Sequence, residues 1–114
     1  MTPDLVPRLT PRDLAAPLGA WATVVQFSST FCAPCRATRR IFERVVATTT
    51  GVTHVELDIA DQHELGERLG IAVTPTVVIL DADGVERGRA TGAPTLAQAR
   101  AAVEAVAGPR RTGP

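Results

Sequence analysis

The chain has 114 residues, which fits one domain and is too short for two, and its 45% apolar content can supply a hydrophobic core without disulfide stapling. The formal net charge is zero, with 12 basic and 12 acidic residues, and the basic residues are scattered along the sequence. A nucleic-acid or anionic-membrane partner calls for a basic excess and is therefore not expected, and the absence of lysine excludes chemistry at a lysine amine.

Residues 1–20 contain Asp4, Arg8, Arg12 and four prolines, and they lack the unbroken apolar run of a signal peptide or a membrane span. We therefore expect a cytoplasmic protein. A membrane-anchored, extracytoplasmic protein is the alternative if an N-terminal segment has been removed.

The first half of the sequence alternates between strand-like and helix-like patterns. Runs rich in β-branched and aromatic residues predict strands, and apolar residues at helical spacing predict helices. The predicted elements are an edge strand at 5–9, a short helix starting at 10–13, a strand at 23–29, a long helix at 32–48 and a strand at 53–59.

The second half continues the alternation and ends in a hairpin and a helix. The turn signal at Asp83-Gly84 separates two strand-like runs. The predicted elements are a helix at 61–69 closed by Gly70, a buried strand at 76–80, its hairpin partner at 85–91, a helix at 95–107 and a disordered tail at 108–114.

This order predicts an α/β protein. Strand–helix–strand alternation requires crossover connections, so we expect a central mixed β-sheet flanked by helices on both faces. Residues 1–107 form the single predicted domain, and 108–114 lie outside it.

The chemistry-bearing motif is the pair Cys32 and Cys35, at the predicted strand-to-helix junction. Two intervening residues place the cysteines one helical turn apart, where a disulfide can form. Cys32 would stand at the helix N-terminus, where unpaired N–H groups favour an anion and lower the pKa of a thiol. Pro34 suits the first helical turn. Cys35, one turn into the helix, would be shielded and act second.

Two alternatives are open for an isolated pair of this spacing. A zinc site needs two further ligands, and the two histidines, His54 and His63, are separated by eight residues, whereas those of a zinc finger are separated by three to five. A metal carrier with this motif would have a smaller chain with a different order of elements. We expect no metal site.

Several segments, taken together, match a known pattern. They are Val25-Gln26-Phe27, Phe31-Cys32-Ala33-Pro34-Cys35-Arg36, Val55-Glu56-Leu57-Asp58, Gly70-Ile71-Ala72-Val73-Thr74-Pro75-Thr76, Asp83-Gly84 and Thr91-Gly92. In this order and spacing, over residues 5–106, the sequence resembles the thioredoxin family. The resemblance implies the thioredoxin fold, with Cys32 as nucleophile and Cys35 as resolving cysteine.

The resemblance also implies a substrate-binding surface around the cysteines. It implies that Pro75 follows a cis peptide bond and that the backbone of Thr74 pairs with the substrate chain. Gly92 would leave room for that chain. Phe31 would form a hydrophobic docking rim, with core packing as its alternative. The residues between the cysteines, Ala33 and Pro34, would also face the substrate.

The sequence departs from the family pattern in its proton-handling residues. Gln26 stands where most members have a buried Asp, and Gln cannot usefully accept a proton. Glu56 stands on the neighbouring strand where the family usually has Lys. We hypothesise that Glu56 reaches beneath the motif as a catalytic acid, its pKa raised by burial; a solvated strand residue is the alternative. Ser28 replaces a common large aromatic residue, which predicts a more open surface near the motif.

The predicted function is thiol–disulfide oxidoreduction, reducing protein disulfides through a mixed disulfide at Cys32 and Cys35. The alternative is a redox-sensing or non-catalytic binding module on a thioredoxin scaffold, with a structural disulfide. The expected partners are protein disulfides or dithiols and a reductant such as thioredoxin reductase or a membrane thiol donor. We expect a monomer with no cofactor beyond the Cys32–Cys35 disulfide.

Overall fold

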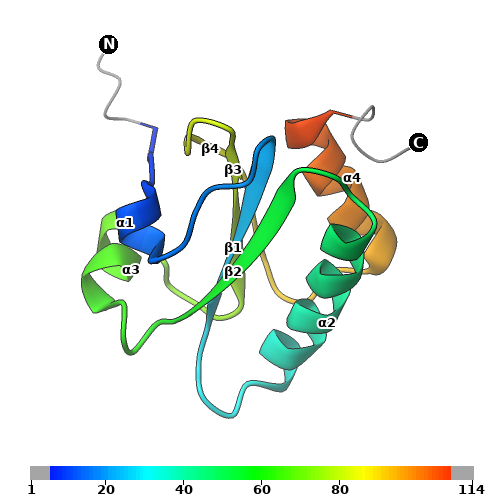
Figure 1. Cartoon of the computed structure of the whole chain (residues 1–114). Coiled ribbons are helices and arrows are strands. Elements are labelled where there is room, and N and C mark those ends of the chain that lie inside the picture. The colour runs from blue at the N-terminus through cyan, green and yellow to red at the C-terminus, as the bar shows by residue number, and fades with distance from the viewer. Residues whose placement is uncertain (1–5, 109–114) are drawn as a thin grey trace.

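A computed structural model describes residues 6–108 and shows a four-stranded sheet between two layers of helices (Figure 1). The elements are α1 (Pro11–Leu14), β1 (Ala22–Ser28), α2 (Ala33–Ala47), β2 (Val52–Asp58), α3 (His63–Leu69), β3 (Thr76–Asp81), β4 (Glu86–Thr91) and α4 (Leu96–Ala107). The strand order is β2-β1-β3-β4. The predicted α/β order and mixed sheet are confirmed, with most element boundaries within one or two residues of the expectation.

Strand β1 lies at the centre of the sheet and is buried along its whole length. It runs parallel to β2 and antiparallel to β3, and β4 completes the sheet as the antiparallel partner of β3. Because β1 and β2 run parallel, α2 carries the crossover between them. The C-terminal end of β1 therefore feeds directly into the N-terminus of α2.

Alternate residues of the strands pack into two separate cores, one on each face of the sheet. Helices α2 and α4 cover one face, and their core includes Phe42, Val45 and Val103. Helices α1 and α3 cover the other face, around Phe27 and Val78. The prediction of helices on both faces is therefore confirmed.

Local signals set the helix ends. Thr10 caps α1 and Thr95 caps α4, each with a reciprocal capping box. Gly70 ends α3 in the left-handed conformation that glycine adopts without strain.

The predicted edge strand at 5–9 is wrong in its extent. Arg8 forms only an isolated bridge with Val85, flanked by the bonds from Leu9 N–H to the Gly84 carbonyl and from Glu86 N–H to the Pro7 carbonyl. Pro7 has no N–H to extend a ladder. Leu5, like residues 109–114 of the predicted tail, lies outside the described residues. Within residues 6–108, no helix has the length and apolar character needed to cross a bilayer.

A close contact at the start of β1 yields a stability prediction. Gly51 has φ +78°, and a Cβ there would lie 2.1 Å from Cδ1 of Trp21, whereas Gly70, with φ +69°, has no atom within 4 Å of its Cβ position. We expect Gly70→Ala to lose about 1 kcal/mol from the left-handed backbone alone. Gly51→Ala should lose about 2–4 kcal/mol because crowding of Trp21 adds to the same backbone strain.

Urea unfolding followed by far-UV circular dichroism would measure both variants. Equal losses in the two variants would show that the indole moves aside freely and that its packing does not secure this end of the strand.

Candidate functional site

Cys32 and Cys35 form a disulfide at the junction between β1 and α2, with their Cα atoms 5.1 Å apart. Cys32 is the N-cap residue of α2 and is partly exposed, whereas Cys35 is buried. The N–H of Cys35 donates to Sγ of Cys32 at 3.1 Å. That N–H is one of the unpaired donors of the helix start, so in the reduced form it would stabilise negative charge on the exposed sulfur.

The first turn of α2 holds the pair in place. Pro34 occupies the first turn, as predicted, where a missing N–H leaves no helix bond unmade. The carbonyl of Pro34 accepts a 2.8 Å bond from Oγ1 of the buried Thr38. Arg36 N–H donates to the Cys32 carbonyl and closes the turn.

A second loop lies at the same end of the sheet. The peptide bond between Thr74 and Pro75 is cis, as the resemblance implies. Thr76, which follows it, pairs with Phe27 at the end of β1, and Oγ1 of Thr74 lies 2.7 Å from Oγ of Ser29. The loop thus packs against the segment that leads into Cys32.

Gly92 belongs to the same cluster. Its N–H donates to the Pro75 carbonyl at 3.0 Å, and its φ of +77° is a conformation that favours glycine. No atom lies within 4 Å of the position where a side chain would begin. The open space beside Pro75 agrees with the room that the resemblance assigns to a substrate chain.

Exposed apolar side chains occur beside Cys32 in the sequence and in the cis-proline loop. Phe31 is 97% exposed and Val73 is 54% exposed, so core packing of Phe31, the alternative at the sequence level, is wrong. Ala33 and Pro34 are exposed between the cysteines. A hollow of about 190 Å³ adjoins Val73 and is lined by Ile59, Ile71, Ala72, Val73 and Thr74. Exposed apolar groups beside a reactive atom are typical of a docking surface.

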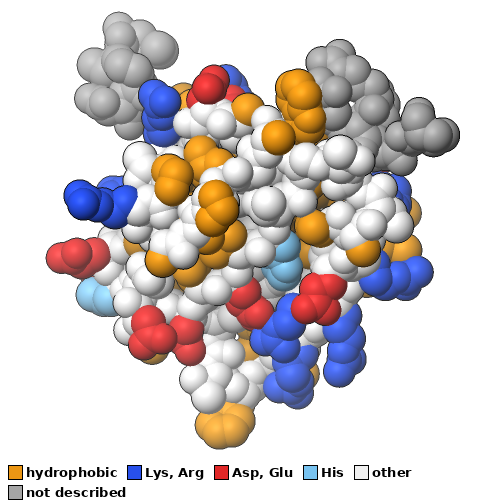
Figure 2. Space-filling view, in the orientation of Figure 1, with side chains coloured by type: hydrophobic (Ala, Val, Ile, Leu, Met, Phe, Trp, Pro, Cys, Tyr) orange, Lys and Arg blue, Asp and Glu red, His pale blue; other side chains and the backbone are white. Residues whose placement is uncertain are grey.

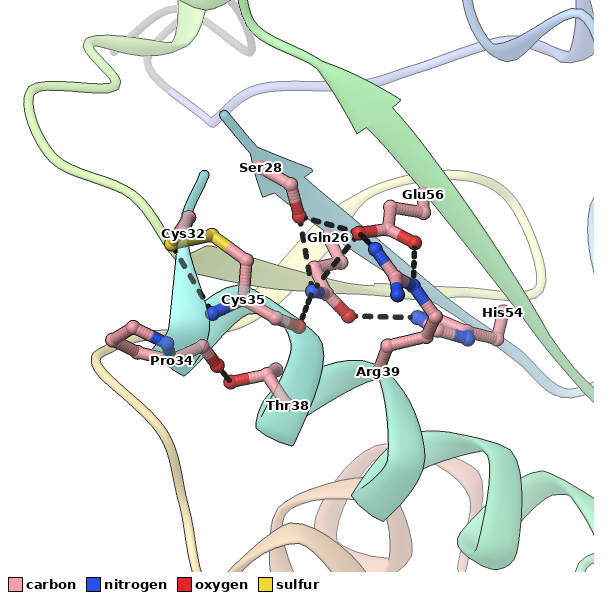
Figure 3. A network of polar contacts seen from close by, with 9 residues as sticks. All are labelled: Gln26, Ser28, Cys32, Pro34, Cys35, Thr38, Arg39, His54 and Glu56. Atoms are coloured by element: carbon pink, nitrogen blue, oxygen red, sulfur yellow. Dashed lines mark hydrogen bonds and ion pairs between the residues drawn. A yellow bond between two sulfur atoms is a disulfide. The ribbon is translucent and has the colours of Figure 1, made fainter. Parts of the chain in front are cut away.

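A buried polar network connects Cys35 to β2 (Figure 3). The fully buried Gln26 donates from Nε2 to the Cys35 carbonyl at 2.8 Å and to Oγ of Ser28 at 3.0 Å. Its Oε1 accepts from Nε2 of His54 at 3.0 Å. The amide is thus satisfied at both ends, which a buried polar group requires.

Glu56 reaches this network, where its carboxylate is paired with a cation. Oε2 of Glu56 accepts from Oγ of Ser28 at 2.7 Å, and both carboxylate oxygens are bonded by the guanidinium of Arg39. Burial by itself raises the pKa of Glu56, but the bonds from Arg39 and Ser28 outweigh it and hold the pKa below its ordinary value. The expected raised pKa is therefore wrong, because the sequence did not reveal the cation opposite.

His54 lies on the other side of Gln26, and its ring stands 6.0 Å from that of Phe42. Burial lowers the pKa of His54, only partly opposed by Glu56 and Glu43. The lowered pKa favours the neutral imidazole, and its Nε2 donates to Oε1 of Gln26.

Sequence reasoning missed three members of this network. Ser28 is buried and bonded, although the sequence predicts a more open surface there. Arg39 is paired with Glu56, and His54 is a partner of Gln26. Strand alternation was the signal that could have found two of them. Gln26 pairs with Glu56 in the parallel register, and Ser28 and His54, each two positions along its own strand, lie on the same face of the sheet. Within the described residues, no three His, Cys, Asp or Glu side chains gather into a metal-binding group.

The whole arrangement can be compared with known proteins. The mouse protein "Thioredoxin domain-containing protein 8" is 29% identical over 65 residues, 57% of this chain and 51% of that protein. Thioredoxin from Malassezia sympodialis is 31% identical over 62 residues, 53% of this chain and 59% of that protein. The chain thus spans about half the length of these curated relatives.

Solved structures show the same fold. Chloroplastic thioredoxin z superposes with a TM-score of 0.67 at 27% identity, covering 76% of this chain and 79% of its own. Fasciola hepatica thioredoxin superposes with a TM-score of 0.68 at 24% identity, covering 77% of this chain and 83% of its own. The family model described as Thioredoxin matches residues 15–105, which span the disulfide, the cis-proline loop and the polar network. The chain belongs to the thioredoxin family.

Proposed function

We propose that this protein reduces protein disulfides through a mixed-disulfide intermediate on Cys32. A thioredoxin fold with this cysteine pair supports thiol–disulfide oxidoreduction in general. The observation that carries the finer proposal is the asymmetry of the pair, with Cys32 accessible at the start of α2 and Cys35 buried behind it.

The proposed reaction moves two electrons in two exchanges. The Cys32 thiolate attacks one sulfur of the target disulfide, and the other target sulfur leaves as a thiolate that takes up a proton. Cys35 then loses its proton and attacks Sγ of Cys32, which releases the second target thiol. The target is reduced by two electrons, and the Cys32–Cys35 disulfide is formed.

The surface around the pair would hold the target chain. The Thr74 backbone would pair with it, Gly92 would leave room beside it, and the apolar rim of Phe31 and Val73 would cover the reacting sulfurs. Ala33 and Pro34 would contact the target between the cysteines. Excluding water there favours exchange over competing reactions.

Further elements of the proposal concern the protein's surroundings. The pair would be regenerated by a thioredoxin reductase, as is general in the family, or by a membrane thiol donor. We propose a cytoplasmic monomer that needs no cofactor beyond its disulfide, with an extracytoplasmic, membrane-anchored form as the alternative.

Trapping variants test the order of attack. Cys35→Ser should accumulate a mixed disulfide with a disulfide-bonded target, because resolution is blocked, and non-reducing electrophoresis with mass spectrometry would identify the linkage at Cys32. The matched Cys32→Ser variant should form no such species. A linkage formed through Cys35 in that second variant would contradict the assigned roles.

A redox titration separates the reductase from the module with a structural disulfide. Equilibration with thiol buffers followed by alkylation should give a midpoint between about −200 and −300 mV, the range that includes the reductants thioredoxin and glutaredoxin. A pair that stays oxidised below about −300 mV would support the structural alternative instead.

The Arg39–Glu56 pair predicts a pH-dependent stability. The pKa of Glu56 is lower in the folded protein than in the unfolded chain. Its contribution to the free energy of unfolding is therefore fully present above the pKa of the unfolded chain and is lost as pH falls through the pKa of the folded protein. Glu56→Gln should therefore unfold more readily than the parent protein at pH 7, by about 1–3 kcal/mol. The difference should shrink below about pH 4, where the parent carboxylate takes up a proton.

The same variant tests catalysis. An ionised carboxylate with a lowered pKa is a poor proton acceptor, so the pH profile of the resolving step between pH 6 and 9 should match that of the parent. Rapid acid quenching followed by alkylation of the released target thiol and mass spectrometry would follow that step. A shift of the pH profile in Glu56→Gln would show instead that Glu56 takes part in proton transfer during the resolving step.

A further inference from the structure

Helix α2 presents a row of unpaired cations that begins next to the disulfide. Arg36, Arg40 and Arg44 follow one another at intervals of four residues, so they form a line about 12 Å long on one face. All three are exposed, and none forms an ion pair within residues 6–108. Figure 2 shows arginine side chains gathered over this helix. We call these three residues the arginine row.

The first part of the arginine row does not stabilise its own helix, whereas Arg44 lies in the last turn, where a cation is favourable. Like charges four residues apart repel one another, and cations near a helix N-terminus oppose the helix dipole. The first turn of α2 contains no acidic residue to offset Arg36. Glu43, on the same helix, forms no ion pair with the row and acts on Arg39 and His54 instead. Arg36, at the start of the helix and four residues from Arg40, is therefore unfavourable to the local energetics of α2.

The charge around the site is also uneven. Arg39, beside the row, is already neutralised by Glu56. On the opposite side of the sheet, the loop and helix after β2 carry the exposed acids Asp61, Glu64 and Glu67. Exposed arginines also occur elsewhere, Arg8 and Arg12 among them, but the arginine row is the set that begins beside the partly exposed Cys32.

We propose that the arginine row docks acidic residues that flank the reactive disulfide of protein targets. This inference deepens the proposed reductase function and rests on it. Arginine forks pair with carboxylates in two-point hydrogen bonds, and unpaired guanidinium groups meet this need without breaking an existing ion pair. A target with carboxylates on the α2 side of its disulfide would be drawn to Cys32 in a productive orientation.

Three disulfide-bonded peptides of equal length test the proposal, with flanking residues that are acidic, neutral or basic. The reduced protein, prepared with dithiothreitol and freed of it, is mixed with each peptide at 20 mM and 300 mM salt. At low salt, the acidic peptide should react about tenfold faster than the basic one, and salt should reduce that ratio toward one.

The paired variant Arg36→Gln/Arg40→Gln should remove most of the acidic preference. Its neutral-peptide rate should change less than twofold, and its melting temperature should be equal to or above that of the parent. The control Arg8→Gln/Arg12→Gln removes the same charge from exposed positions on and before α1 and should keep the preference.

The outcomes separate the two proposals. Failure to reduce any peptide would overturn the reductase function itself. Equal loss of rate on all three peptides would show that the row acts on the Cys32 thiolate and not on the target, which overturns the docking inference. Loss of binding to phosphatidylserine vesicles in the paired variant, without a change in peptide preference, would assign the row to a membrane and also overturn it.

Discussion

Pairing of the central strand β1 with both neighbours is the constraint on which the site depends. The parallel register with β2 sets Gln26 opposite Glu56, and the antiparallel register with β3 sets Phe27 opposite Thr76. One end of the sheet therefore receives the helix start with its cysteines, the cis-proline loop and Gly92. A slip of one residue in either register would turn every side chain to the opposite face and separate these parts.

Beneath the disulfide, a neutral amide occupies a position where a charge would be costly. Gln26 is fully buried and satisfies its hydrogen bonds with the Cys35 carbonyl, Ser28 and His54. The ionised group is moved outward to Glu56, whose side chain is 24% exposed and bonded to Arg39. The arrangement holds the resolving cysteine through its backbone and keeps the full charge at the edge of the core.

The surface beside the disulfide combines two kinds of contact. The exposed side chains of Phe31 and Val73 form an apolar rim against which a target chain could bury apolar surface. Such burial is non-directional, so it would favour targets of many different sequences. The arginine row adds a long-range attraction that depends on the charge of the target. Apolar contacts do not depend on the charge of the target, whereas the arginine row does. Together they would let one site accept many disulfides and still prefer those with acidic neighbours.

The sequence by itself determined the order of elements, the helix caps and the identity of the reactive pair, because periodicity, capping chemistry and the spacing of Cys32 and Cys35 are local properties. It also placed Glu56 on the correct face through strand alternation. Only the tertiary structure decided what those side chains meet: Arg39 lies 17 residues before Glu56, and Ser28 lies 28 residues before it. The sign of a pKa shift depends on such distant partners, and so burial read from the sequence predicted a raised pKa where the packed cation lowers it.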